Sequence, residues 1–205
     1  MTNNYDLIVP LLDWRSEDDF YFLQILQRKK DHAKGKVNGV NNNSRLVKAY
    51  YLRSAGHLEF IMPEVIELCE IFNARAGINL NRRSFEKMAL QHLKKVTDQI
   101  INGDHRKAYK AYSSVVGAFA QESDKKWILD VDEPFYGSVD DGAKGIGMLM
   151  YINTECKPYG EKFIESIPSK NGYHLITKPF DLSGFRSEFP DVEVHKNNPT
   201  NLYIS

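Results

Sequence analysis

The chain has 205 residues, of which 42% are hydrophobic and 26% are charged, and its 27 basic and 27 acidic side chains cancel. This composition is typical of a globular protein and excludes long-range disorder and collagen-like structure. No apolar run approaches the roughly 20 residues that span a bilayer, and the N-terminus lacks signal-peptide features, so we expect a cytoplasmic protein without a membrane partner. Residues 1–122 carry 18 basic and 14 acidic side chains, whereas residues 123–205 carry 9 basic and 13 acidic ones. Because the chain as a whole has no positive charge, we expect phosphate binding only where basic residues gather locally.

The first part of the chain predicts a mixed α/β module. Ser16, the acidic residues after it and the basic residues near position 30 predict a helix over 16–30. A stretch rich in Gly, Asn and Lys at 31–44 predicts a mobile loop. Residues 46–62 predict two short strands around a turn at 55–56, and Pro63 predicts the start of a helix. A strand over 74–81, a helix capped by Ser84 and a further helix from residue 104 complete the module.

The second part predicts a different arrangement. A strand ends at Asp132, a short helix covers residues 147–156, and two strands over 162–169 and 172–180 form a hairpin. A short helix at 182–189 and strands at 192–194 and 201–205 follow. The order β-α-β-β-α-β is that of a ferredoxin-like or RRM-like sheet. We therefore expect an α+β protein with an N-terminal module at 1–123 and an RRM-like core at 124–205, either separate or integrated into one domain.

The first candidate site is the pair Asp130 and Asp132 at the end of an apolar strand. Residues i and i+2 of a strand point to the same face, so the two carboxylates lie side by side. Two such charges favour a cation between them, and Mg²⁺ or Mn²⁺ prefers carboxylate oxygens. In the alternative interpretation, Asp132 begins a turn before Pro134 and Asp130 only faces solvent.

The second candidate site is the hairpin segment 169–174. It places Ser169, Lys170 and Gly172 just before His174, close to the start of a strand that can lie beside Asp130. A histidine there could donate to a nucleotide phosphate, and Gly172 would let backbone N–H groups approach the phosphate. The alternative is an ordinary turn followed by a half-buried histidine bonded to a backbone carbonyl.

Together, the D-x-D motif and the later S-x-x-G-x-H motif resemble the archaeo-eukaryotic primase superfamily, which includes the primase-polymerases. The resemblance covers residues 125–178 and implies an RRM-like catalytic half preceded by an α/β module. It implies that Asp130 and Asp132 hold two metals and that Ser169 and His174 contact the phosphates of an incoming nucleoside triphosphate. The family motif also has a third acid on a later strand. Here Glu193 or Asp191 would have to replace that acid, although neither of them fits the motif closely.

Basic residues of the first part are candidates for contacts with a nucleic acid. Arginine binds phosphate in a bidentate manner, and a tyrosine such as Tyr50 or Tyr51 could stack on a base. In the alternative interpretation, these side chains belong to a solvated strand face. The candidates are Arg45, Lys48, Arg53, Arg75, Arg82 and Arg83.

The leading hypothesis is a primase-polymerase-like nucleotidyltransferase that uses Mg²⁺ or Mn²⁺, a nucleoside triphosphate and a single-stranded DNA or RNA template, alone or with a helicase or another replication protein. Its expected catalytic residues are Asp130, Asp132, His174 and Glu193. One alternative is an inactive RRM-like module that binds single-stranded nucleic acid or a protein, and another is a metal-dependent nuclease. The motifs distinguish neither DNA from RNA nor one oligomeric state from another.

Overall fold

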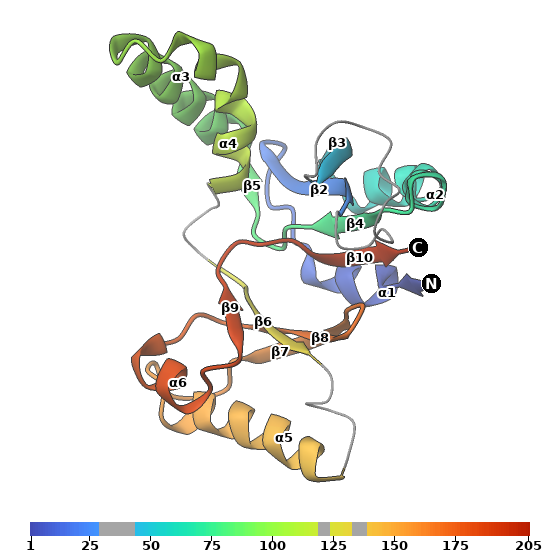
Figure 1. The fold of residues 1–205 in the computed structure, drawn as a ribbon, viewed down its shortest axis with the longest axis vertical. Coiled ribbons are helices and arrows are strands. Elements are labelled where there is room, and N and C mark those ends of the chain that lie inside the picture. The colour runs from blue at the N-terminus through green and yellow to red at the C-terminus, as the bar shows by residue number, and fades with distance from the viewer. Residues whose placement is uncertain (29–43, 119–123, 133–138) are drawn as a thin grey trace.

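The computed structural model describes residues 1–28, 44–118, 124–132 and 139–205, and it shows an α+β protein with two antiparallel sheets (Figure 1). The predicted loop at 31–44 lies outside the described residues except for Ser44. The strands are β1 (Thr2–Asn3), β2 (Asp19–Gln27), β3 (Arg45–Leu52), β4 (Arg75–Ile78), β5 (Arg83–Ser84), β6 (Trp127–Asp132), β7 (Phe163–Pro168), β8 (Gly172–Thr177), β9 (Glu193–His195) and β10 (Thr200–Ile204). The helices are α1 (Tyr5–Ile8), α2 (Ala55–Phe72), α3 (Phe85–Ile101), α4 (Ala111–Ala118), α5 (Val139–Thr154) and α6 (Leu182–Glu188), with 3₁₀ helices η1 (Val9–Leu11) and η3 (His105–Lys110).

The first sheet has the strand order β1-β10-β4-β2-β3, and β5 pairs with the beginning of β2. Strand β2 is central and pairs with β3 on one side and with β4 on the other. Helix α2 covers this sheet through Leu58, Val65 and Cys69, which are fully buried. The helical hairpin of α3 and α4 extends away from both sheets (Figure 1).

The second sheet has the strand order β7-β8-β6-β9, and all of its pairs are antiparallel. Helices α5 and α6 lie on the side of this sheet that faces away from the first sheet (Figure 1). Met148 of α5 and Phe185 of α6 pack there against Leu129 and Leu175 of the two central strands.

The two sheets share a hydrophobic core, and the last strand connects them. Ile128, Ile167 and Ile176 of the second sheet belong to the same buried cluster as the α2 side of the first sheet. After β9 the chain returns to the first sheet, where β10 lies between β1 and β4. The boundary expected at residue 123 therefore lies between the strands of the first sheet and those of the second, with one exception. Strand β10 follows this boundary in the chain but belongs to the first sheet.

Two of the predicted elements are wrong. Residues 19–27 form the central strand β2 and not a helix, and Asp19 binds the backbone N–H groups of Arg15 and Ser16 through its carboxylate. Residues 55–72 form the single helix α2, whose N-cap is the side chain of Ser54, in place of a hairpin followed by a shorter helix. Pro63 lies inside this helix.

Other predictions are confirmed. Ser84 caps α3 by accepting a hydrogen bond from the N–H of Lys87 at 3.1 Å. The strand ending at Asp132 and the hairpin of β7 and β8 are present, and α5 begins earlier than expected. Within the described residues, we find no helix that is both long and apolar enough to cross a membrane.

Candidate functional site

Three neighbouring strands of the second sheet bring the candidate chemical groups into register. Asp130 of β6 lies opposite His174 of β8 on one side and opposite Glu193 of β9 on the other. Residues opposite one another in an antiparallel pair have their side chains on the same face. The pairing therefore gathers a carboxylate, an imidazole and a second carboxylate from segments that are far apart in the sequence.

The alternation of β6 explains why this face is polar. Trp127, Leu129 and Val131 belong to the core under α5 and α6, whereas Ile128 belongs to the core that the two sheets share. Successive side chains of a strand point to opposite faces, so Asp130 points with Ile128 toward the first sheet. The candidate site thus lies on the side of the second sheet that faces the first sheet, and not beneath its helices.

His174 is held from both sheets. Its Nδ1 lies 2.8 Å from Oγ1 of Thr200, which is fully buried on β10, and its Nε2 lies 3.5 Å from Oδ1 of Asp130. Burial lowers the pKa of His174, although Asp130 acts in the opposite direction, and the positive charges of Arg28 and Arg75 lower it further. A neutral imidazole whose Nε2–H faces the carboxylate must accept at Nδ1, so the Thr200 hydroxyl donates to it.

Asp130, Glu193 and His195 form a group that could hold a metal ion. One ligand atom from each of them lies within 4.8 Å of the others. Nε2 of His195 is 3.3 Å from Glu193 and 3.9 Å from Asp130. Glu193 and His195 are two residues apart on β9 and so share a face. Glu193, one of the two residues expected to replace the third acid, therefore lies beside Asp130.

A pocket of about 270 Å³ opens between the two sheets at this point. Asp130, His174 and His195 line it from the second sheet, while Arg28 and Arg75 line it from the first. One side of the pocket therefore carries a carboxylate and two imidazoles, and the other side carries two arginines. The other residues that line the pocket are Leu26, Ser44, Gly77, Asn198, Pro199 and Asn201.

The remaining motif residues lie at one end of the same strands. Asp132 is exposed at the end of β6, opposite Gly172 at the start of β8, and two residues from Asp130 on the same face. Ser169 closes the hairpin turn, since its N–H donates to the carbonyl of Gly172 at 2.8 Å. Lys170 is exposed at this turn. Asp132 is not part of the three-residue group that could hold a metal among the described residues.

Of the six basic residues expected to contact nucleic acid, Arg75 lies in the pocket. Arg45 lies over the ring of Phe72, and Lys48 forms an ion pair with Glu64. Both are on β3, the edge strand of the first sheet, and Arg53 is exposed just after it.

Arg82 and Arg83 face the protein interior, which corrects the expectation that they are available to a nucleic acid. Arg83 is fully buried and donates to the carbonyls of Val116 and Asn81 at 2.8 and 2.9 Å. Burial lowers its pKa to about 10. Arg82 is 9% exposed, donates to the carbonyl of Asp13 at 2.8 Å and lies 3.4 Å from the Asp19 carboxylate.

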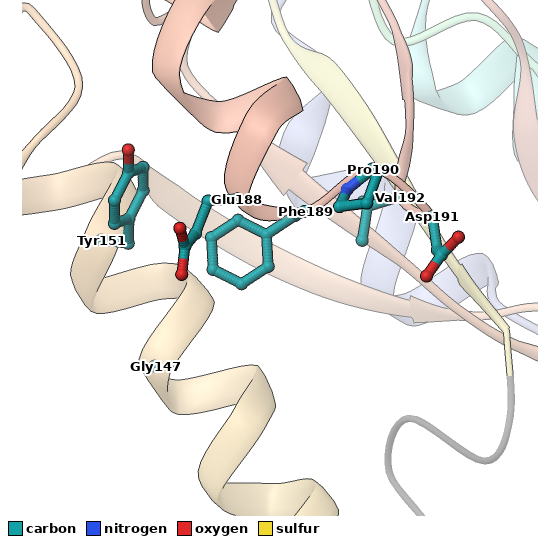
Figure 2. A pocket seen from close by; sticks show the side chains of 7 residues that line it. All are labelled: Gly147, Tyr151, Glu188, Phe189, Pro190, Asp191 and Val192. Atoms are coloured by element: carbon teal, nitrogen blue, oxygen red, sulfur yellow. The ribbon is translucent and has the colours of Figure 1, made fainter.

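A second pocket, of about 410 Å³, lies between α5 and the segment after α6 (Figure 2). Tyr151 and Phe189 line it, with ring centroids 5.5 Å apart. Asp191, the other candidate for the third acid, lines this pocket and not the one between the sheets. Glu193 is favoured over Asp191 as the partner of Asp130, because it lies opposite Asp130 in the sheet and within 4.8 Å of it in the three-residue group.

The structure adds three residues to the expected site: His195 and Arg28, which line the pocket between the sheets, and Thr200, which contacts His174. His195 could have been found, because it follows Glu193 by two residues on a predicted strand. Arg28 was assigned to a helix end, and Thr200 precedes a strand whose sheet the sequence does not reveal. No protein-family model matches the chain, and no curated protein or solved structure shows a significant similarity to it.

Proposed function

We propose that the protein is a metal-dependent nucleotidyltransferase of the primase-polymerase type, with its active site between the two sheets. The observation that carries this proposal is the register of β8, β6 and β9, which places Asp130 between His174 and Glu193. Asp130 and His174 share a pocket with Arg28 and Arg75. The order of elements from β6 to β9 and the strand order β7-β8-β6-β9 further support an RRM-like core.

The donor set fits a divalent cation. Metal ligands lie roughly 2.0–2.6 Å from the ion, so ligands of one ion are at most about 5 Å apart. The atoms of Asp130, Glu193 and His195 meet this limit with a separation of at most 4.8 Å. When bound, Mg²⁺ or Mn²⁺ would stabilise negative charge on phosphoryl oxygens. Asp132, two residues further along β6 and on the same face, would contribute a ligand to a second cation.

The protein's own groups would bind and orient a triphosphate. Arg28 and Arg75 line the pocket opposite Asp130 and offer guanidinium groups suited to phosphate oxygens. Thr200 fixes the ring of His174 so that Nε2 points to the same space. Such prior orientation reduces the entropy cost of placing the reacting phosphate in line with an attacking 3′ hydroxyl.

Primer extension tests this proposal. A labelled primer on a single-stranded template is incubated with the full chain, Mn²⁺ and the four nucleoside triphosphates, in deoxy and ribo form. We expect elongated products from the wild type and at least about a hundredfold loss in Asp130→Asn and Glu193→Gln, because each removes a charge that the transition state needs. Glu67→Gln, an exposed acid on α2, serves as the matched control.

The other outcomes are distinct. Equal elongation by the wild type and the two variants would reject the assigned site. Shortening of the labelled strand would assign a nuclease, and retention of the oligonucleotide without any turnover would assign a binding module.

A further inference from the structure

A third pocket, of about 490 Å³, lies between the start of the chain and one face of α2. Helix α2 lines it with four residues at helical spacing: Glu59, Met62, Pro63 and Ile66. The start of the chain contributes Asn3, Tyr5 and Asp6. None of these residues lines the pocket between the sheets, so the two pockets are separate features of the molecule.

Apolar surface continues beyond this pocket. Phe60 is 83% exposed and lies about one turn of α2 from Pro63, which is also exposed. Leu7, two residues after Tyr5, is 36% exposed. Exposed apolar side chains that adjoin a pocket are typical of an interaction surface. A small molecule in the pocket would leave Phe60 uncovered, whereas a helix can cover the pocket and the phenylalanine together.

The charge around the pocket has one sign. Residues 1–14 and 55–72 together contain six Asp and Glu and no Lys or Arg. Within the described part of the chain, neither Asp6 nor Glu59 forms an ion pair. Burial raises the pKa of Tyr5, and the negative charges of Glu59 and Asp6 raise it further. The pocket therefore lies in the field of two carboxylates.

The elements that pack against α1 and α2 do not neutralise this charge. Strand β10 carries no charged residue, and β2 and β7 carry one acid each and no Lys or Arg. On β3, Lys48 forms an ion pair with Glu64, and Arg45 lies over the ring of Phe72. The arginine of β4 lines the pocket between the sheets.

Pro63 adds a backbone acceptor to this site. It lies inside α2 and has no N–H, so the carbonyl of Glu59 lacks the i+4 donor that it would otherwise have. Both residues line the pocket. The site thus combines two carboxylates with a carbonyl oxygen, and all of these suit the N–H groups of lysine or arginine.

The negative charge opposes several other occupants. A nucleic acid or an anionic membrane surface would be repelled, because both carry negative charge themselves. In a two-fold pairing of two copies through this face, the acids of one copy would meet the same acids of the other, without a Lys or Arg from either segment between them.

We propose that the pocket between α1 and α2 is a docking site for a basic amphipathic helix of a partner protein. The apolar side chains of the partner pack on Met62, Ile66 and Phe60, and its Lys or Arg side chains face Asp6 and Glu59. A helix in an apolar groove is a common form of peptide recognition. The inference does not depend on the nucleotidyltransferase site, since the two sites share no residue.

A designed peptide tests this surface. The probe is a fluorescent amphipathic helix of about 14 residues, held by a side-chain lactam, with leucine on one face and arginine at its borders. Its twin has glutamate in place of each arginine. In anisotropy titrations with the full chain, we expect the basic peptide to bind at least about tenfold more tightly than the acidic one.

Variants at exposed positions locate the binding. Asp6→Lys with Glu59→Lys should reverse the preference toward the acidic peptide, and Phe60→Gln should weaken the basic peptide several-fold. Two matched controls should leave its affinity unchanged. They are Glu161→Lys, an exposed acid before β7, and Leu93→Gln, which is 65% exposed on α3.

Three results would overturn the proposal. The first is equal binding of both peptides by the wild type, or equal weakening by the controls. The second is binding of n-hexylamine as tightly as the basic peptide, which would make the site a pocket for a small cationic molecule. The third is sedimentation of the wild type as a dimer that Phe60→Gln converts to a monomer, since the face would then belong to a second copy.

Discussion

His174 and Thr200 connect the two sheets through one buried hydrogen bond, with Nδ1 of the ring 2.8 Å from the threonine hydroxyl. Thr200 is the first residue of β10, the strand that returns to the first sheet. The contact therefore fixes the imidazole of the second sheet from a strand of the first sheet. The orientation of His174 depends on a residue 26 positions later in the chain.

Thr200→Val keeps the shape of the side chain and removes the hydroxyl, so that Nδ1 of His174 loses its donor. We predict a loss of about 1–3 kcal/mol in the free energy of unfolding, because a buried polar atom is left unsatisfied. We also predict weaker binding of a nucleoside triphosphate in the presence of Mn²⁺. Urea denaturation and calorimetric titration measure the two effects. Thr200→Ser, which retains the hydroxyl, should restore both, and failure to do so would argue against the hydrogen bond.

Gly77 allows a close approach between β4 and the segment before β10. A Cβ atom at this position would lie 3.1 Å from Cβ of Pro199, and both residues line the pocket. We predict that Gly77→Ala costs about 1–3 kcal/mol of stability and weakens triphosphate binding, since Pro199 must move. The matched control is Gly56→Ala in the first turn of α2, where a Cβ meets nothing within 4 Å. That substitution should leave stability unchanged or raise it by up to about 1 kcal/mol.

The same substitution should lower stability at Arg83 and triphosphate affinity at Arg75. Arg83→Met leaves the carbonyls of Val116 and Asn81 without a donor, so we predict a loss of about 1–3 kcal/mol in stability with triphosphate affinity retained. Arg75→Met should reduce the affinity several-fold because it removes a charge from the pocket. Chemical denaturation and calorimetric titration of both variants check the contrast. A fall in affinity confined to Arg83→Met would reverse the assignment of the two arginines.

The buried thiol of Cys69 should make the free energy of unfolding fall at alkaline pH. Burial in the core under α2 raises the pKa of its thiol from 9.0 to about 12. Between these values the folded chain keeps the proton and the unfolded chain loses it, so stability is complete below pH 9 and falls as the pH rises. The unfolding equilibrium constant should increase by up to about tenfold per pH unit in this window.

Urea denaturation at pH 7, 8, 9 and 10 measures this effect. Cys69→Ala should show a smaller loss of stability above pH 9 than the wild type, because Lys and Tyr residues titrate equally in both. Parallel pH profiles for the two proteins would contradict the role assigned to the thiol.

The sequence predicts strands well where one face is polar and the other apolar. In β6, Leu129 and Val131 alternate with Asp130 and Asp132, and this period of two correctly places both acids on one face. Strand β2 has no such alternation. It is paired on both sides and buried on both faces over most of its length, so its continuous apolar run fits a helix equally well.

The acidic residues before β2 were misleading for a physical reason. They resemble the first turn of a helix, yet Asp18 accepts the N–H of Glu86 and thus stabilises the start of α3, 68 residues away.

For the site, the two motifs identify Asp130 and His174. The pairing of Glu193 with Asp130 depends on the register of β9, and the contact with Thr200 depends on the sheet that β10 joins. Neither is encoded locally.

Binding of Mn²⁺ to the full chain, followed by the electron paramagnetic resonance signal of the free ion, is the most direct test of the site between the sheets. We predict that the wild type removes Mn²⁺ from solution and that Glu193→Gln weakens this binding at least about tenfold, while Asp191→Asn does not change it. Binding by Glu193→Gln that equals the wild type would contradict the assignment of β9 to the metal site.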